Sequence, residues 1–241
     1  MKVYCQGIKT NLKKLKMSNN NDTPFYYSNK YGLIFYKSSE KVLSSDELST
    51  VDNHINGFSS EGFYHLEKIV LTQDVTSVIW NGLGRHSFNC FEVDPNNPVF
   101  EVFGGVLYTK KGYDRQGNTN RKKMRELVAC PTNVSNHKVI HGTTRIANCA
   151  FKGSCIANLS LPSTLEEIGT NAFYFADQLK SIEIPSSIRI IEPQLTRTQL
   201  LIRFDNHQFE SWDNLFSYML DNGFEKKNNK IKMKYDCYNS K

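Results

Sequence analysis

Histidines, glycine pairs and adjacent carboxylates are the residues of this sequence best suited to chemistry, but their spacing forms no catalytic or metal-binding motif. His137 and His141 lie on a predicted strand and turn, whereas a zinc-binding His-x-x-x-His pair needs a helix to bring both rings to one side. The glycines at 82–84 and 104–105 lack the Lys-Ser/Thr of a phosphate-binding loop, so we interpret them as turn residues. The glutamates at 166–167 fall between core positions, and we expect a solvated corner there. We predict no catalytic residue, no metal site and no cofactor.

Six cysteines are present, without a Cys-x-x-Cys pair or a Cys/His cluster at zinc-ligand spacing. Cys90, Cys130 and Cys149 lie in apolar or repeat segments, where a free cysteine behaves as a small buried hydrophobe. Cys149 and Cys155 are close enough in sequence to pair, although nothing requires it. This pattern of cysteines favours a reducing compartment for the protein.

Basic residues gather in three segments, at 9–16, 121–125 and 226–234, in a chain of net charge +6. Such clusters can follow a nucleic-acid backbone or an anionic surface, or they can be solvated loops and termini. The residues that would contact an anionic ligand are Arg121, Lys122, Lys123, Arg125, Lys226, Lys227 and Lys230.

An internal repeat decides the fold. The pattern Ile-x-x-x-Ala-Phe occurs at 146–151 and again at 168–173, and an apolar triplet at 66–71 returns at 88–93, both at a shift of 22 residues. One coil of that length cannot bury its apolar side alone, whereas stacked coils align these positions into a continuous core. The repeat therefore predicts a solenoid, in which Phe173 fills the core and Pro185 follows a short strand.

The segments "LKSIEIPSSIRII", "IGTNAF" and "IANCAFKG" resemble the BspA-like class of leucine-rich repeats, whose coil reads approximately L-x-x-I-x-I-P-x-x-V-x-x-I-G-x-x-A-F. Residues 93–112, followed by the strand "ELVACP", are similar to an insertion in that class. The resemblance covers residues 66–192, and later residues depart from the pattern. It implies cell-surface adhesion and protein recognition.

We therefore predict an α/β repeat solenoid of leucine-rich-repeat type, with right-handed, β-dominated coils of 22–23 residues and a short-stranded parallel sheet. The expected organisation is an N-terminal flank at 1–60, a solenoid at 61–195 with an insertion near 94–138, and a C-terminal β-α-β-like cap at 196–241.

The flanks carry their own patterns. Residues 24–39 predict a hairpin, 44–55 a short N-capped helix, 200–204 a strand, 211–224 an amphipathic helix and 230–235 an edge strand. Because a solenoid needs atypical ends to cover its last exposed core, we interpret both flanks as caps, with a separate partner-binding module as the alternative.

The functional prediction is a non-catalytic scaffold that binds a protein or glycan across the exposed face of its sheet, and the alternative is a nucleic-acid or anionic-surface binder. The resemblance points to the cell surface or to secretion. No apolar segment follows the positive start at residues 1–17, as a secretory signal requires, so a cytoplasmic location stays open, as does the oligomeric state. No stretch reaches the roughly 20 apolar residues of a membrane-spanning helix. The outward residues of the sheet, which form the candidate binding site, are Lys68, Val70, Glu92, Lys138, Asn158, Ser160, Ser181 and Glu183.

Overall fold

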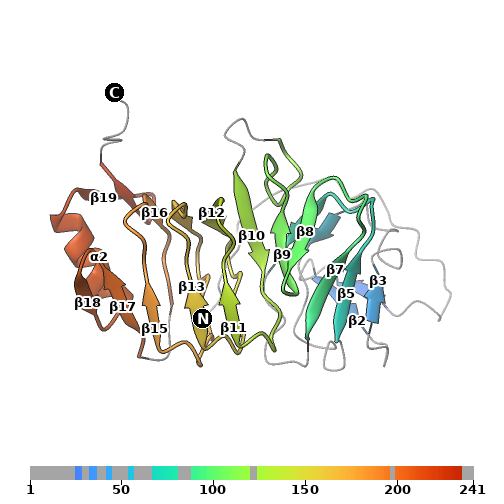
Figure 1. Ribbon diagram of the computed structural model, residues 1–241, viewed down its shortest axis with the longest axis horizontal. Coiled ribbons are helices and arrows are strands. Elements are labelled where there is room, and N and C mark those ends of the chain that lie inside the picture. Colours follow the sequence, from blue (N-terminus) through green and yellow to red (C-terminus); the bar gives the residue numbers. More distant parts are fainter. Residues whose placement is uncertain are drawn as a thin grey trace.

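The computed structural model is a β-solenoid of about six turns (Figure 1). It describes residues 25–28, 33–36, 42–44, 54–56, 67–80, 88–119, 124–195 and 199–234. The predicted α/β fold class fits only loosely, because it implies more helix than is found. The described residues form strands and a single helix, α2 (Trp212–Asp221). Coils this short, with an aliphatic residue at every second position, favour strands of two to five residues over helices.

The strands lie on two sides of the solenoid, which we call side A and side B. In Figure 1 the strands of side A follow one another along the lower part of the view, with the C-terminal end at the left. Side A consists of β3 (Val42–Ser44), β5 (Lys68–Leu71), β7 (Cys90–Val93), β11 (Asn136–Lys138), β13 (Asn158–Ser160), β15 (Ser181–Glu183), β17 (Leu201–Phe204) and β18 (His207–Phe209).

Side B consists of β4 (His54–Asn56) with β6 (Ser77–Ile79), and of an eight-stranded sheet. The order of that sheet is β19 (Phe224–Lys227), β20 (Lys230–Met233), β16 (Ile190–Ile191), β14 (Glu167–Ile168), β12 (Thr143–Ile146), β10 (Arg125–Ala129), β9 (Val106–Thr109) and β8 (Phe100–Phe103).

The register of the parallel strands follows the sequence repeat. His137 pairs with Leu159, and Arg145 pairs with Glu167, each at a shift of 22 residues. Ile168 then pairs with Ile191, at a shift of 23. The predicted coil length is therefore confirmed in this region, because equal coils put equivalent apolar residues side by side in the core.

The predicted insertion forms an antiparallel hairpin, β8–β9, whose sheet then continues into β10. Gly104 and Gly105 link paired Phe103 and Val106 with φ of +57° and +79°, the two left-handed residues of a tight turn. The turn interpretation is confirmed for these glycines, while residues 82–84 lie outside the described residues. The Gly105 carbonyl accepts a hydrogen bond from the Phe91 amide at 3.0 Å, so the hairpin tip is attached to β7.

The hairpin also divides the interior into two cores. Along β9, Val106 and Tyr108 pack into the C-terminal core, whereas Leu107 between them packs into the N-terminal core. On β10, Leu127 packs into the C-terminal core and Val128 packs into the N-terminal core. Because successive side chains of a strand point to opposite faces, β9 and β10 form a wall that is apolar on both faces.

Phe173 lies in the C-terminal core and is only 2% exposed, as predicted. Its ring stacks on Phe151 at 5.5 Å between centroids and on Trp212 at 6.0 Å. The stack therefore links two successive coils to α2, which covers the end of the core.

The C-terminal region differs from the prediction in two respects. β17 pairs in parallel with β15, so the repeat continues beyond Glu192, where the sequence pattern was expected to end. β20 was predicted as an edge strand, but it lies between β16 and β19. Strand alternation alone cannot tell an inner strand from an edge strand.

The predicted helix at 211–224 is confirmed as α2. Ser211 caps it by accepting a hydrogen bond from the Asn214 amide at 3.1 Å. Trp212, Leu215 and Met219 are its buried residues, which gives the helix the apolar face that the spacing indicated.

In the N-terminal flank, β1 (Phe25–Ser28) and β2 (Leu33–Tyr36) form the predicted antiparallel hairpin. The helix predicted at 44–55 is wrong at both ends, because Ser44 is the last residue of β3 and His54 is the first residue of β4. Residues 45–53 lie outside the described residues.

Candidate functional site

Five of the eight predicted binding residues lie together on side A. Lys138, Asn158, Ser160, Ser181 and Glu183 are all exposed on β11, β13 and β15. Between the outward pairs of β13 and β15, Leu159 packs against the core and Ile182 is buried in it with 2% exposure. The period-2 alternation of a strand thus fixes which side chains are presented to solvent.

Two further residues complete this surface, and sequence reasoning missed both. Asn136 is the Cα partner of Asn158, and their side chains are hydrogen-bonded at 2.5 Å. Arg203 is exposed on β17 beside Glu183. Asn136 could have been found from the 22-residue shift, whereas the coil that leads to Arg203 is shortened to 20 residues. We call these seven residues the polar face: Asn136, Lys138, Asn158, Ser160, Ser181, Glu183 and Arg203.

The three charged side chains of the polar face, Lys138, Glu183 and Arg203, form no ion pair with any residue that the structure describes. Glu183 and Arg203 are direct neighbours across β15 and β17. Charges on this face are therefore available to a partner.

The other three predicted residues lie on β5 and β7, on the far side of the β8–β9 hairpin tip. Lys68 and Glu92 form an ion pair at 2.6 Å, and the hydrogen bond to Glu92 raises the pKa of Lys68. Val70 is half-buried. The structure thus divides the predicted row into a neutralised pair and the separate polar face.

His137 lies on β11 between Asn136 and Lys138, but its ring is turned towards the hairpin. Its Nε2 is 2.6 Å from the Tyr108 hydroxyl, and burial lowers the pKa of His137 while raising that of Tyr108. This contact joins the polar face to the wall between the two cores.

The residues of the alternative anionic-ligand site are dispersed. Arg125 forms an ion pair with Glu101 at 2.7 Å and lies over the Phe103 ring. Lys230 pairs with Glu192 at 2.5 Å. Lys226 and Lys227 are exposed on β19. Arg121, Lys122 and Lys123 lie outside the described residues.

Side B carries a ladder of opposite charges on its outward positions, which sequence reasoning did not detect. Arg145 lies between its cross-strand partners Glu126 and Glu167, at 3.0 Å and 2.5 Å. Arg115 also pairs with Glu126 at 2.5 Å. Glu167 was expected on a solvated corner but is half-buried on β14, because its two-residue strand is too short to give a sequence signal.

The ladder ends at Glu192, which is 5% exposed. Burial opposes the ionisation of its carboxyl, but hydrogen bonds from Lys230 and Thr170, together with the nearby charges of Lys230 and Arg145, outweigh this and lower its pKa. Three cations, Arg115, Arg145 and Lys230, thus face three carboxylates, Glu126, Glu167 and Glu192.

Cys90, Cys130, Cys149 and Cys155 are free thiols, so Cys149 and Cys155 do not form a disulfide. Within the described ranges, no group of three or more His, Cys, Asp or Glu residues is placed to hold a metal ion. In the same part of the chain, no helix is long and apolar enough to cross a bilayer.

Comparison with solved structures finds bacterial leucine-rich repeat proteins. A leucine-rich repeat protein from Eubacterium ventriosum is 16% identical, with a TM-score of 0.42, over 61% of this chain and 43% of that chain. The pneumococcal vaccine antigen PcpA is 21% identical, with a TM-score of 0.39, over 70% and 44%. A leucine-rich cell surface protein from Faecalibacterium prausnitzii is 10% identical, with a TM-score of 0.27, over 68% and 81%.

The chain thus matches less than half the length of the first two, and no curated protein matches it. The model of the BspA type leucine-rich repeat region matches residues 129–205 with six copies. This range includes β11, β13, β15 and β17 of side A and β12, β14 and β16 of side B. The chain therefore carries a leucine-rich repeat region of the BspA type, as the repeat in its sequence indicated.

Proposed function

We propose that this chain is a non-catalytic interaction scaffold that binds a protein partner on the polar face. The supporting observation is a set of seven outward side chains on four successive strands, all of them polar or charged. A repeat region presents such a face as a broad, rigid surface. Adhesion is one function that binding through this surface would serve.

The polar face is not needed to hold the fold together. Its charged residues are exposed and form no ion pair within the described ranges, while the ladder on side B is paired throughout. Exposed surface pairs add little stability in any case. Side chains that contribute little to folding are free to contribute to recognition.

A protein partner fits this face better than a neutral glycan. Lys138 carries a positive charge at one end, Glu183 carries a negative charge two strands further, and Arg203 lies beside it. Such alternating charges match a protein surface with complementary charges, where electrostatics set register and specificity. The amides and hydroxyls between them also suit glycan hydroxyls, so a glycan is the alternative occupant.

Selection with the full chain tests the proposal. The chain is immobilised and used to select binders from a library of displayed 15-residue peptides, and in parallel it is applied to a glycan array. We expect the selected peptides to bind the Glu183→Lys variant at least tenfold more weakly, because reversing one charge places like charges together. Lys227→Glu, on the exposed edge of side B, is the matched control and should leave the affinity unchanged.

Peptides that bind both variants as well as the wild type would place the binding surface elsewhere. If the chain binds neutral glycans and the Asn158→Ala variant does not, the ligand of the polar face is a glycan and not a protein.

A second candidate function rests on the hairpin β19–β20. Lys226, Lys227, Lys232 and Lys234 are exposed there, and only Lys230 is engaged with Glu192. These lysines could hold an anionic surface or a nucleic-acid backbone. Binding of duplex DNA measured from 50 to 200 mM salt should weaken steeply if phosphate contacts are involved, and no binding at 50 mM salt would eliminate this function.

A further inference from the structure

The strand β11, which carries the first two residues of the polar face, is attached differently at its two edges. At one edge it pairs in parallel with β13, and the Val139 amide donates to the Ser160 carbonyl at 2.9 Å. At the other edge it has no strand partner among the described residues, and the β8–β9 hairpin lies between it and β7 (Figure 1). His137 follows Phe91, its equivalent on β7, by 46 residues, or two coil lengths. One strand of side A is therefore skipped beside β11.

Two polar contacts attach β11 where this strand is skipped. In the turn before β11, Asn133 donates its backbone amide to the Phe88 carbonyl at 3.1 Å and its side-chain amide to Asn89 at 2.7 Å. On β11 itself, the His137 Nε2 lies 2.6 Å from the Tyr108 hydroxyl. Because no ladder backs them up at this edge, the loss of either contact should loosen the strand.

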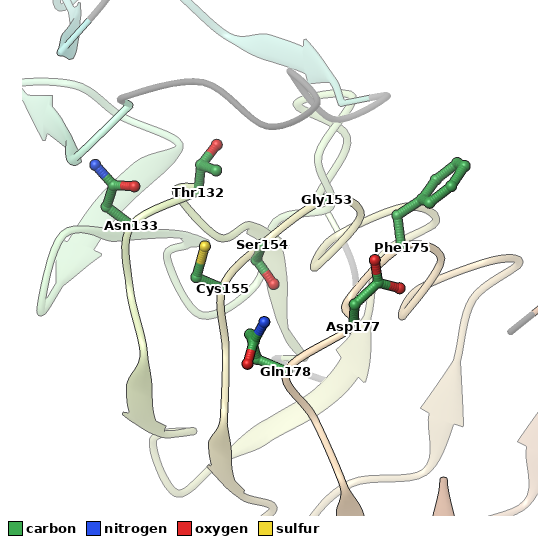
Figure 2. Close-up of a pocket in the computed structure, with 8 residues that line it drawn as sticks. All are labelled: Thr132, Asn133, Gly153, Ser154, Cys155, Phe175, Asp177 and Gln178. Carbon is green, nitrogen blue, oxygen red and sulfur yellow. The ribbon is translucent and has the colours of Figure 1, made fainter. Parts of the chain in front are cut away.

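The contact at the turn lacks a group that titrates near neutral pH. Asn133 lies at a pocket of about 260 Å³ between the loops of three successive coils, and Figure 2 shows the eight residues that line it. No histidine is among them, and histidine is the side chain whose ordinary pKa lies between pH 5 and 8. Of the two contacts, the one at His137 is therefore the one that can respond to pH in this range.

The hydrogen bonds of Tyr108 determine where the proton on His137 lies. Burial raises the pKa of Tyr108, and a hydrogen bond from the Ile140 backbone opposes this effect. A bond that favours the phenolate comes from a donor, which is the Ile140 amide. The hydroxyl therefore accepts from Ile140 and donates its own hydrogen to Nε2 of His137. His137 is then neutral, with its proton on Nδ1.

A second proton on His137 would remove this arrangement. Nε2 would become a donor, while the Tyr108 hydroxyl already accepts from Ile140 and would keep a hydrogen without a partner. Tyr108 is fully buried, and a buried donor without a partner is costly. Burial accordingly lowers the pKa of His137. The His137 side chain is itself only half-buried, so water can deliver the proton.

The charges around this pair do not stabilise a protonated ring. Arg125, the nearby cation that acts on the phenol, is held by Glu101 at 2.7 Å. Burial raises the pKa of the Cys130 thiol, which keeps it neutral. β13 and the turn of the β8–β9 hairpin carry no charged residue. On β11 itself, Lys138 has the same sign as a protonated His137 and would repel it.

We propose that His137 is a proton switch for the polar face, in which a proton on Nε2 releases β11 from the wall formed by β9 and β10. Asn136 and Lys138 flank His137 on the same strand, so the release displaces the first two residues of the polar face. Binding at this face should then weaken in acid. That consequence rests on the proposed function, whereas the switch itself does not.

Hydrogen exchange of the full chain, followed by NMR, tests the switch. In the released strand, the pKa of His137 returns towards the ordinary histidine value of 6.5. Because the attached form has the lower pKa, release is favoured as the pH falls below 6.5. We expect the protection of the Val139 amide to fall at least about threefold between pH 7 and pH 5 after correction for intrinsic exchange. The Ile184 amide, which bonds to Arg203 at 2.8 Å, is the internal reference and should not change.

Three variants separate the switch from a general effect of acid. His137→Gln keeps an acceptor for the Tyr108 hydroxyl but cannot titrate, so it should abolish the fall in protection. His141→Gln, at an exposed position after the same strand, is the matched control and should keep the fall. Tyr108→Phe should lower the protection of Val139 already at pH 7.

An equal fall in the wild type and in His137→Gln would overturn the proposal, as would a His137 ring that titrates at or above pH 6.5. The peptides selected on the full chain are then tested at pH 7 and pH 5. A loss of Val139 protection without any change in peptide binding would support the switch and contradict the polar face as the binding surface.

Discussion

The polar face on side A and the charge ladder on side B are built from the same repeat but use charge in opposite ways. On side B, Arg145 lies between Glu126 and Glu167, and each charge has a partner on the neighbouring strand. On side A, Lys138, Glu183 and Arg203 form no ion pair with any described residue. The comparison teaches that the charges of the ladder are paired within the chain, while those of the polar face are left to interact.

The burial of the charges agrees with this difference. Glu126 and Glu192 are 4% and 5% exposed, whereas the polar face is open to water. A charge that has lost most of its hydration needs a partner, and removing that partner is costly. A charge in water needs none. Substitutions in the charge ladder should therefore change stability, and substitutions on the polar face should change binding.

A substitution in the core between the two sides should cause the largest loss of stability. Phe173→Ala removes a ring stacked between Phe151 and Trp212 and should lower the free energy of unfolding by about 3–5 kcal/mol. Denaturant unfolding measures it, with Phe209→Ala, a partly buried ring at the edge of the same core, as the milder control. An unfolding curve equal to that of the wild type would contradict the placement of Phe173.

On side B, Arg145→Met should cost about 1–3 kcal/mol, because it removes the cation that lies between Glu126 and Glu167 and leaves the buried Glu126 with Arg115 as its remaining described ion-pair partner. The matched variant on side A is Arg203→Met, which should change the free energy of unfolding by less than about 0.5 kcal/mol. Both are measured by denaturant unfolding at pH 7. Equal losses in the two variants would remove the contrast between the two faces.

Glu192 should make side B sensitive to acid. The pKa of Glu192 is lowered in the folded state. The carboxylate therefore contributes stability above the pKa of an unfolded glutamate, near 4.5, and this contribution is lost as the pH falls through the lower folded pKa. The melting temperature of Glu192→Gln should therefore lie below that of the wild type at pH 7, with the difference shrinking towards pH 3. A difference that stays constant over this range would show that Glu192 is not held as a carboxylate.

The smallest effect on stability is expected on the polar face. Asn158→Ala removes an exposed hydrogen bond to Asn136 and should change the free energy of unfolding by no more than about 0.5 kcal/mol. Thermal melting measures the stability, and the peptides selected on the full chain measure the binding. A loss above 1 kcal/mol would mean that this amide pair supports the fold instead of serving recognition.

Much of the architecture could be predicted from the sequence, because the core repeats. The Ile-x-x-x-Ala-Phe pattern placed Phe173 in the core, and alternation around Ile182 placed Ser181 and Glu183 outside. Such positions depend on local period and are visible in one stretch of chain. The repeat was lost where its length changed, as in the 20-residue coil that ends at Arg203.

The charge ladder could not be predicted in this way. Arg145 contacts Glu126, 19 residues earlier, and approaches Glu192, 47 residues later, at 3.9 Å. Which charges meet depends on the stacking of coils and on a register shift between β10 and β12. Neither of these can be predicted from the local sequence pattern. Glu167 was for this reason misplaced on a solvated corner.

The sequence by itself determined the solenoid, its coil length and which side chains of a strand face the core, because these follow from the period of the apolar residues. The tertiary structure decided which outward charges are satisfied and which are left free, because ion pairing depends on distances between coils. It also brought Phe175, Asp177 and Cys155 around one pocket, since a pocket exists only where loops from different coils come together.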